Sequence, residues 1–298
     1  MSSPVCFRLM AHSSLAMNTM PKGEVARTQQ PTQGKLSVLL AVMLLSVALF
    51  RIVELPALSW GVFQVFGSPL GLRVGGQALL MVLVAGLVFT GTLAIVQEHP
   101  LASHRVRPLV FSLITPTMGS LVASVLLTQA STWALWLLAF VAAGIVVGGL
   151  VYLSYQSVAV EARGYTFARA VLNVVDYVAG FVLLSVILEQ QGRALITAPA
   201  VALLSGLWIA ELLSVTGAPL KRVMLYSGAA ALLEAELVWI LAYARLSPWS
   251  VAALLAIVVY VWVGISYQHL LERLNRRVIF EFVGMGMLMT LAVLLLAP

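Results

Sequence analysis

Charged side chains inside apolar stretches are the residues of this chain that could carry chemistry. Glu234 and Glu236 both lie in the apolar stretch 222–244, and Glu234 falls near its midpoint. A central Asp, Lys or Arg costs about 2.5–3.5 kcal/mol to insert into a bilayer, and we assume that Glu is similar. The two residues lie about 200° apart on a helix, so they cannot share one face. We expect at least one to face protein or water, and the sequence leaves open which one.

Other carboxylates lie nearer to one end of their stretches. Asp176, the only Asp in the chain, lies about 9 Å inside its stretch, and Asn173 sits one turn earlier on the same helix face. Glu211 and Glu281 lie within two turns of the same membrane surface. If these acids converge with Glu234, they would form a binding vestibule for a cation or a proton.

Each of these acids also has a structural interpretation. Glu211 and Glu281 could extend to the membrane surface and pair with Arg or Lys there, which we favour for both. Asp176 and Glu234 could hydrogen-bond inside the bundle, and the sequence does not separate that role from binding. We therefore take Asp176, Asn173, Glu234, Glu236 and Glu211 as the candidate binding residues.

Catalytic and metal-binding patterns are absent from the sequence. It contains no HExxH, GxSxG, GxGxxG or phosphate-binding P-loop, and no paired-Asp motif. His99 and His104 flank a short connection without further ligands at suitable spacing, and the single Cys6 allows neither a disulfide nor a Cys-based zinc site. We expect no cofactor, no metal and no catalytic residue, and we lean against an enzyme.

The composition indicates that lipid surrounds most of the chain. Of its 298 residues, 61% are hydrophobic and 9% are charged, with a mean hydropathy of +1.03. Soluble domains carry about 25% charged residues. Nine stretches reach the roughly 20 apolar residues that cross a bilayer, which predicts an all-α, polytopic transmembrane helical bundle. These stretches are 36–55, 74–96, 108–128, 132–154, 170–189, 194–215, 222–244, 248–270 and 278–297.

Basic residues predict the orientation of these spans. With the N-terminus inside, 13 of the 17 Lys and Arg residues, Arg163 and Arg169 among them, fall in inward-facing segments and 4 in outward-facing ones. Basic loops resist translocation, so we predict that the N-terminus is inside and that the C-terminus is outside. The net charge of +6 then favours contact with anionic headgroups at the cytoplasmic face and not nucleic acid.

The domain organisation follows from the same pattern. Residues 1–35 are polar and contain three prolines, which predicts a disordered cytoplasmic tail. Residues 36–298 form a single transmembrane domain with short connections. The longest outer connection, about 56–73, carries Trp and Phe residues typical of a segment at the headgroup boundary.

Two patterns inside the spans concern helix shape and packing. Pro116, between two threonines in the third span, predicts a kink whose freed carbonyl accepts a hydrogen bond from a neighbouring hydroxyl. Gly144 and Gly148 form a GxxxG pattern that permits close helix contact.

Short motifs near both ends of the apolar region resemble an uncharacterised bacterial family of multi-pass membrane proteins, a domain of unknown function. They are Arg51-Ile52-Val53-Glu54-Leu55-Pro56, Gly67-Ser68-Pro69-Leu70 and Leu246-Ser247-Pro248. The resemblance covers about 50–277 and leaves out the tail and the last span. It implies a bacterial inner membrane and no particular activity.

Three functions fit these observations. The favoured one is a small transporter or permease-like protein with an inward-facing acidic cavity that uses Asp176 and Glu234. The alternative is a non-catalytic subunit or assembly partner of a larger membrane complex, with protein partners in the membrane, in which the acids hydrogen-bond to neighbouring helices. A lipid-modifying membrane enzyme is the third.

Overall fold

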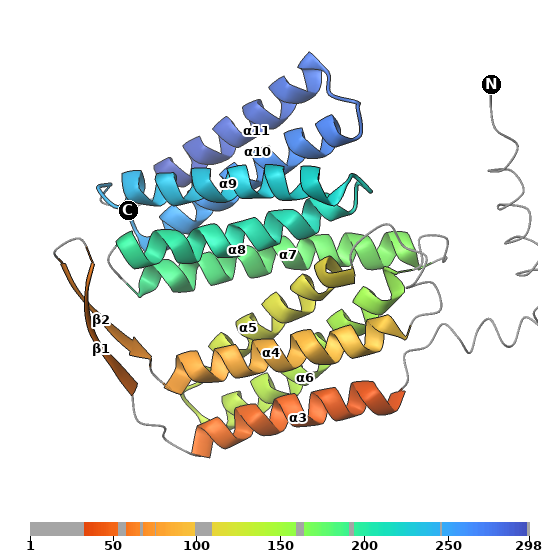
Figure 1. Cartoon of the computed structure of the whole chain (residues 1–298), viewed down its shortest axis with the longest axis vertical. Coiled ribbons are helices and arrows are strands. Elements are labelled where there is room, and N and C mark those ends of the chain that lie inside the picture. Colours follow the sequence, from red (N-terminus) through yellow and green to blue (C-terminus); the bar gives the residue numbers. More distant parts are fainter. Residues whose placement is uncertain are drawn as a thin grey trace, which may run out of the picture.

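A computed structural model of the chain describes residues 33–52, 58–65, 68–74, 76–98, 109–158, 164–190, 194–244 and 246–296. These residues form an elongated bundle of long helices that run side by side, with one β-hairpin at its edge (Figure 1). The elements are α3 (Gln33–Ile52), β1 (Leu58–Val65), β2 (Ser68–Val74), α4 (Gly76–Gln97), η2 (Leu109–Leu113), α5 (Ile114–Gln129), α6 (Trp133–Gln156), α7 (Tyr165–Glu189), α8 (Ala194–Ser214), α9 (Leu220–Leu241), α10 (Pro248–Leu270) and α11 (Arg276–Leu296).

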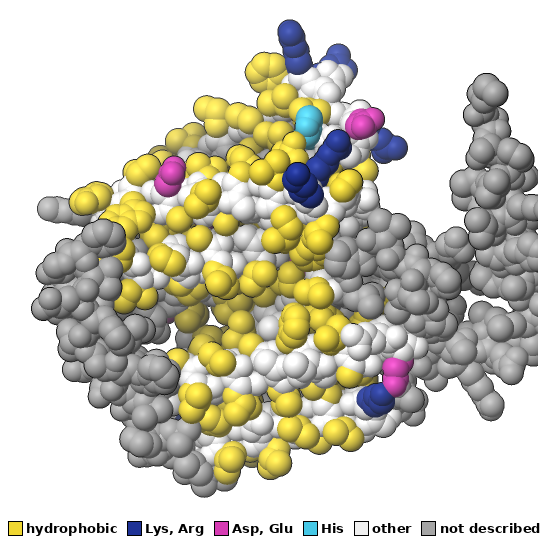
Figure 2. Space-filling model, viewed as in Figure 1, with side chains coloured by type: hydrophobic (Ala, Val, Ile, Leu, Met, Phe, Trp, Pro, Cys, Tyr) yellow, Lys and Arg dark blue, Asp and Glu magenta, His cyan; other side chains and the backbone are white. Residues whose placement is uncertain are grey.

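The predicted helical bundle is confirmed for the described part of the chain. Nine of its helices are long and apolar enough to cross a membrane, and each overlaps one predicted stretch. Hydrophobic side chains cover the sides of the helices, whereas Lys and Arg on the visible face gather near the ends at which α3 and α9 begin (Figure 2). This distribution indicates a membrane protein.

Local sequence explains where several helices begin. Ser247 caps α10 by accepting a hydrogen bond from the Ser250 amide over 3.2 Å, and Pro248 occupies the first turn, where its missing N–H is not needed. Thr132 caps α6 in the same way through the Leu135 amide over 3.3 Å. Each polar cap immediately precedes an apolar run, which is why the predicted and observed starts agree closely.

The hairpin is the one described departure from helical structure, and it was not predicted. β1 and β2 pair antiparallel, with Leu58 opposite Val74 and Val65 opposite Ser68. The hairpin lies at the end of the bundle where α3 ends and α4 begins (Figure 1). The pairing gives hydrogen-bond partners to backbone N–H and C=O groups that a single extended segment would leave without partners.

The bundle has two packed halves that share one helix. One hydrophobic core is formed mainly by α7 to α10, and a second by α3, α4 and α6. α5 contributes Ile114 and Met118 to the first core and Ala123 and Leu127 to the second. α5 is accordingly the most buried of the nine helices, whereas α11 is the least buried and packs mainly on α10.

Pro116 lies close to a helix boundary. It is in the first turn of α5, directly after the short 3-10 helix η2. Pro is well tolerated in a first turn, because the amide that it lacks would have no partner there. The Thr117 hydroxyl donates to the Leu113 carbonyl over 2.7 Å, as expected for a hydroxyl beside a proline.

The GxxxG pattern does mark a close helix contact. A Cβ atom at Gly144 would lie 3.2 Å from a Leu44 methyl group, and one at Gly148 would lie 2.9 Å from a Leu40 methyl group. Both leucines belong to α3. The two glycines therefore let α3 approach α6.

Candidate functional site

A buried ion pair joins α7 to α8. Arg169 Nη1 donates to Glu211 Oε1 over 2.9 Å, and Nη2 donates to Oε2 over 3.3 Å. Arg169 is only 5% exposed and Glu211 is 0% exposed. The paired geometry uses both terminal nitrogens of the guanidinium, which makes it stronger than a single contact.

Arg169 lies in a different place from the one predicted. It was expected in an inward-facing connection, but α7 begins at Tyr165 and includes it. Buried residues recur every three or four positions along α7, and Arg169, Leu172 and Asp176 are among them. Arg169 therefore belongs to the interior of the bundle, and twelve basic residues, 13 less one, remain in the inward-facing set. The surplus over the 4 outward-facing residues persists.

Glu211 pairs with a basic residue, as we favoured, but it does so inside the bundle and not at the membrane surface. Thr115 of α5 donates its hydroxyl to Oε1 over 3.4 Å, and Ser214 donates to Oε2 over 3.2 Å. Three helices thus meet at one carboxylate. The polar side chains of α5, α7 and α8 compensate a charge that the surrounding core could not stabilise.

Asp176 continues this polar face deeper into the bundle. It is 0% exposed, lies seven residues beyond Arg169 and acts electrostatically on the guanidinium. Seven residues correspond to about 10 Å along a helix and return to nearly the same face. Asn173 lies between them and is half-buried, and its amide oxygen has no hydrogen-bond partner among the described residues. One guanidinium therefore faces two carboxylates.

Glu234 and Glu236 have opposite environments on α9. Glu234 is 1% exposed, and neither of its carboxylate oxygens has a hydrogen-bond partner within the described part of the chain. Glu236 is exposed on the side of the helix. The structure thus answers the question that the sequence left open, because Glu234 is the residue that faces the bundle interior.

The predicted convergence of the carboxylates is only partly found. Glu211 and Asp176 share Arg169, whereas Glu281 is exposed on α11. Antiparallel α8 and α9 place Gly206 against Ala231, with their Cβ positions 3.2 Å apart. Glu211 lies five residues from Gly206 toward one membrane surface, and Glu234 lies three residues from Ala231 in the opposite direction. Glu234 is therefore eight residues deeper than Glu211, which is about 12 Å.

The acids consequently occupy two levels, with Glu211 on one and Asp176 and Glu234 on the deeper one. Trp208 of α8, one turn deeper than Glu211, is fully buried. Its ring packs edge-on against Tyr177 at 5.5 Å, and it fills the space beside Gly180, where a Cβ would lie 2.6 Å from the ring. The indole is a bulky side chain at the level between the two sets of acids.

Sequence reasoning missed Arg169, Thr115, Ser214 and Trp208. The available signal was the spacing of seven residues between Arg169 and Asp176, which places both on one helix face. Arg169 was assigned to a loop because charge normally marks the end of a span. The contacts of Thr115 with Glu211 join residues 96 positions apart and have no local signal.

Metal binding finds no support in the described residues. Among them, no group of three or more His, Cys, Asp and Glu side chains is arranged to hold a metal ion. His99 and His104 lie outside the described residues, as do residues 1–32 of the predicted tail 1–35. The predictions made for these segments stay predictions.

A model of the DUF5656 family, described as a protein of unknown function, matches residues 56–296. The chain belongs to the DUF5656 family. This fits the uncharacterised family that the short motifs resemble, and the match extends past residue 277 to include α11. The DUF5656 region contains Arg169, Asp176, Glu211 and Glu234. No curated protein and no solved structure matches the chain.

Proposed function

We propose that this protein is a small proton-coupled transporter or permease in which the buried carboxylates bind and release protons. The observation that carries the proposal is a charge imbalance inside the bundle. Among the described residues, three carboxylates, Asp176, Glu211 and Glu234, are at most 1% exposed, and Arg169 is the one buried basic side chain. Burying more negative than positive charge is costly, so this arrangement favours uptake of a positive charge.

A proton suits these acids better than a metal ion. Metal cations need several convergent ligands, whereas the acids here lie on two levels that are about 12 Å apart. A proton needs only one carboxylate oxygen. Glu234, whose oxygens have no hydrogen-bond partner in the described residues, is the simplest place for one.

Arg169 could pair with either of two carboxylates. It pairs with Glu211 and lies within electrostatic range of Asp176. A proton on Glu211 would remove its charge and release the guanidinium toward Asp176. Protonation would thereby change a contact between α7 and α8, which is how proton binding could be linked to a helix movement.

We propose that the inward-facing acidic cavity forms in a second conformation of the protein. In the described conformation the acids are buried, and Trp208 is packed against Gly180. Water would reach Glu211 only if α7 and α8 separated at the end where α7 begins. We retain the orientation with the N-terminus inside, because the surplus of inward basic residues persists without Arg169. A location in the inner membrane is proposed from the family resemblance.

The test is proton movement in vesicles that contain the purified full chain. A potassium diffusion potential is imposed, a trapped dye reports internal pH, and a panel of amino acids, sugars and organic cations is added one at a time. At least one solute should evoke proton flow, and Asp176→Asn should abolish it. Glu236→Gln is the matched control, because Glu236 is an exposed acid and should leave the flow unchanged.

A direct readout of protonation keeps the test decisive when no solute responds. Infrared difference spectra between acidic and alkaline buffer should show carboxyl bands that disappear in Asp176→Asn, Glu211→Gln or Glu234→Gln. If none of the three changes removes a band, the buried acids do not exchange protons and the proposal fails.

A second candidate, a subunit of a larger membrane complex, is favoured by α11. This helix is the least buried of the nine and leaves large side chains such as Phe280 and Leu295 exposed. A partner helix would bury that face. Recovery of a stoichiometric partner after mild extraction from native membranes, together with the absence of proton flow, would favour this function over transport.

A further inference from the structure

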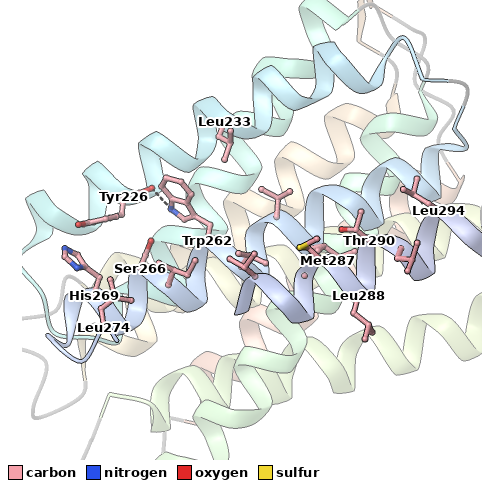
Figure 3. A pocket seen from close by; sticks show the side chains of 17 residues that line it. Tyr226, Leu233, Trp262, Ser266, His269, Leu274, Met287, Leu288, Thr290 and Leu294 are labelled. Carbon is pink, nitrogen blue, oxygen red and sulfur yellow. Dashed lines mark hydrogen bonds between the residues drawn. The ribbon is translucent and has the colours of Figure 1, made fainter. Parts of the chain in front are cut away.

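An apolar groove runs between α9, α10 and α11, away from the buried acids. Its volume is about 920 Å³, and most of its lining is aliphatic, from residues such as Ile257, Val261 and Leu291. The groove is not enclosed, and Figure 3 shows side chains from the three helices directed into it. Along its wall on α10, Ile257 and His269 are twelve positions apart, which is about 18 Å.

One end of the groove is polar. Tyr226, Ser266 and His269 lie together at this end, and the remaining labelled side chains along the groove are mainly apolar (Figure 3). The Tyr226 and His269 rings are 5.9 Å apart, and Trp262 Nε1 donates to the Tyr226 carbonyl over 3.1 Å. The phenol and the imidazole thus offer hydrogen-bonding groups where the apolar lining ends.

Basic side chains surround this polar end. α9 begins and α10 ends here, and Figure 2 shows Lys and Arg side chains on both sides of the exposed histidine. The two described acids in the same region, Glu272 and Glu281, do not balance them. The exposed basic residues are Lys221, Arg222, Arg273, Arg276 and Arg277.

A tight turn joins α10 to α11 within this basic cluster. The Arg273 amide donates to the Gln268 carbonyl and the Glu272 amide to the His269 carbonyl, each over 3.0 Å. Glu272 has a φ of 57°, so the turn is the glycine-type end of a helix with Glu in the left-handed position. The chain reverses at once, and α11 therefore begins with Arg276 and Arg277 beside the end of α10.

The groove between α3 and α4 provides an internal comparison. It has a volume of about 590 Å³ and is also apolar, and it ends at Lys35. Lys35, however, forms an ion pair with Glu98. Within the described part of the chain, that groove carries no surplus of positive charge at its end, so the described charges distinguish it from the groove of α9 to α11.

We propose that the groove of α9, α10 and α11 is a binding site for one anionic phospholipid. An acyl chain lies along Ile257, Val261 and Leu291, and the phosphate lies at the basic end beside Tyr226 and His269. The length of about 18 Å matches one leaflet of a hydrocarbon core that is about 30 Å thick. The surplus of Lys and Arg selects a negative headgroup over a zwitterionic one.

Native mass spectrometry of the full chain in detergent tests this site. The protein is titrated with phosphatidylglycerol and with phosphatidylcholine of the same acyl chains. Each Lys or Arg near an anionic lipid surface contributes about fivefold in affinity. Arg276→Gln/Arg277→Gln should therefore weaken phosphatidylglycerol binding roughly 30-fold and leave phosphatidylcholine binding unchanged.

Two further variants separate the groove from the charges. Thr290→Trp places a ring in the groove and should prevent retention of either lipid, whereas Leu295→Trp, on the same helix but outside the groove, should not. Glu272→Gln removes an exposed negative charge and should tighten phosphatidylglycerol binding about fivefold. Because this variant should bind more tightly, a loss of folding could not produce the expected result.

Three outcomes would overturn the proposal. Equal retention of both lipids by the unmodified chain would show that the basic end does not select charge. Unchanged phosphatidylglycerol binding in both Glu272→Gln and Arg276→Gln/Arg277→Gln would do the same. A dimer that binds no lipid and dissociates on Thr290→Trp would show that a second copy of the chain occupies the groove.

Discussion

Replacing one member of the Arg169–Glu211 pair should lower the free energy of unfolding more than replacing both members. Arg169→Met leaves Glu211, which is 0% exposed, without its counter-charge, and Glu211→Leu leaves Arg169, which is 5% exposed, without its main partner. Removing one member of a buried pair typically costs about 3–5 kcal/mol of unfolding free energy. We expect each single variant to fall in that range.

The double variant Arg169→Met/Glu211→Leu should be more stable than either single variant. Buried pairs replaced by apolar side chains of similar volume are often neutral or even stabilising. In the double variant, the hydroxyls of Thr115 and Ser214 lose the Glu211 carboxylate as an acceptor. Ser214 keeps its hydrogen bond of 2.7 Å to the backbone carbonyl at 211, and Thr115 loses only a long contact of 3.4 Å. We therefore expect a loss below about 2 kcal/mol for the double variant.

The assay is a double-mutant cycle on purified protein in detergent micelles. Unfolding by denaturant is followed by helix content, and the coupling is the double-variant loss minus the sum of the two single losses. A coupling stronger than about 3 kcal/mol is expected. The double variant also separates stability from function, because the proposed transporter should be folded and inactive without Arg169 and Glu211.

Two results would refute this reasoning. Single losses below about 1 kcal/mol would mean that water reaches the pair, because exposed ion pairs contribute that little. Additive losses would mean that the two charges do not interact. Retained proton flow in a stable double variant would leave the structural argument intact and exclude the pair from the transport mechanism.

The remaining predictions use a matched pair of acids and a matched pair of glycines. Glu234→Leu should raise the unfolding free energy by about 1–3 kcal/mol, because the buried carboxylate has no hydrogen-bond partner among the described residues, while Glu236→Leu on the exposed face should change it little. A loss of stability in Glu234→Leu would contradict this. Gly180→Ala should lower the thermal midpoint, at a cost of about 1–3 kcal/mol, because its Cβ would lie 2.6 Å from an indole ring. Gly149→Ala, with nothing within 4 Å, should be neutral or slightly stabilising, and equal midpoints for the two variants would show that the indole can move aside.

The spans were predictable because their signal is local. A helix that crosses hydrocarbon needs about 20 consecutive apolar residues, and any window of the sequence displays that requirement. The stretch 248–270 was predicted with the bounds that α10 has, since a Ser-Pro pair marks its start. The hairpin of β1 and β2 escaped prediction, because short apolar and aromatic runs between glycines suit a strand and an interfacial segment equally well.

The candidate site was predictable only in part. Asp176 and Glu234 were selected because a carboxylate deep in a span is costly wherever it points, and both prove to be buried. Arg169 was missed because it lies one turn inside α7, where charge usually marks the end of a helix. The contact of Thr115 with Glu211 depends on how α5 packs against α8, and no local pattern reports that packing.

The sequence by itself determined the membrane architecture, because the cost of burying charge in lipid and the length of an apolar run are properties of each segment alone. Only the tertiary structure decided which charges meet. Rotation and register of packed helices placed Arg169 between Glu211 and Asp176, turned Glu234 inward and left Glu236 exposed. Those choices depend on side-chain packing between distant segments, as does the groove that α11 forms with α9 and α10.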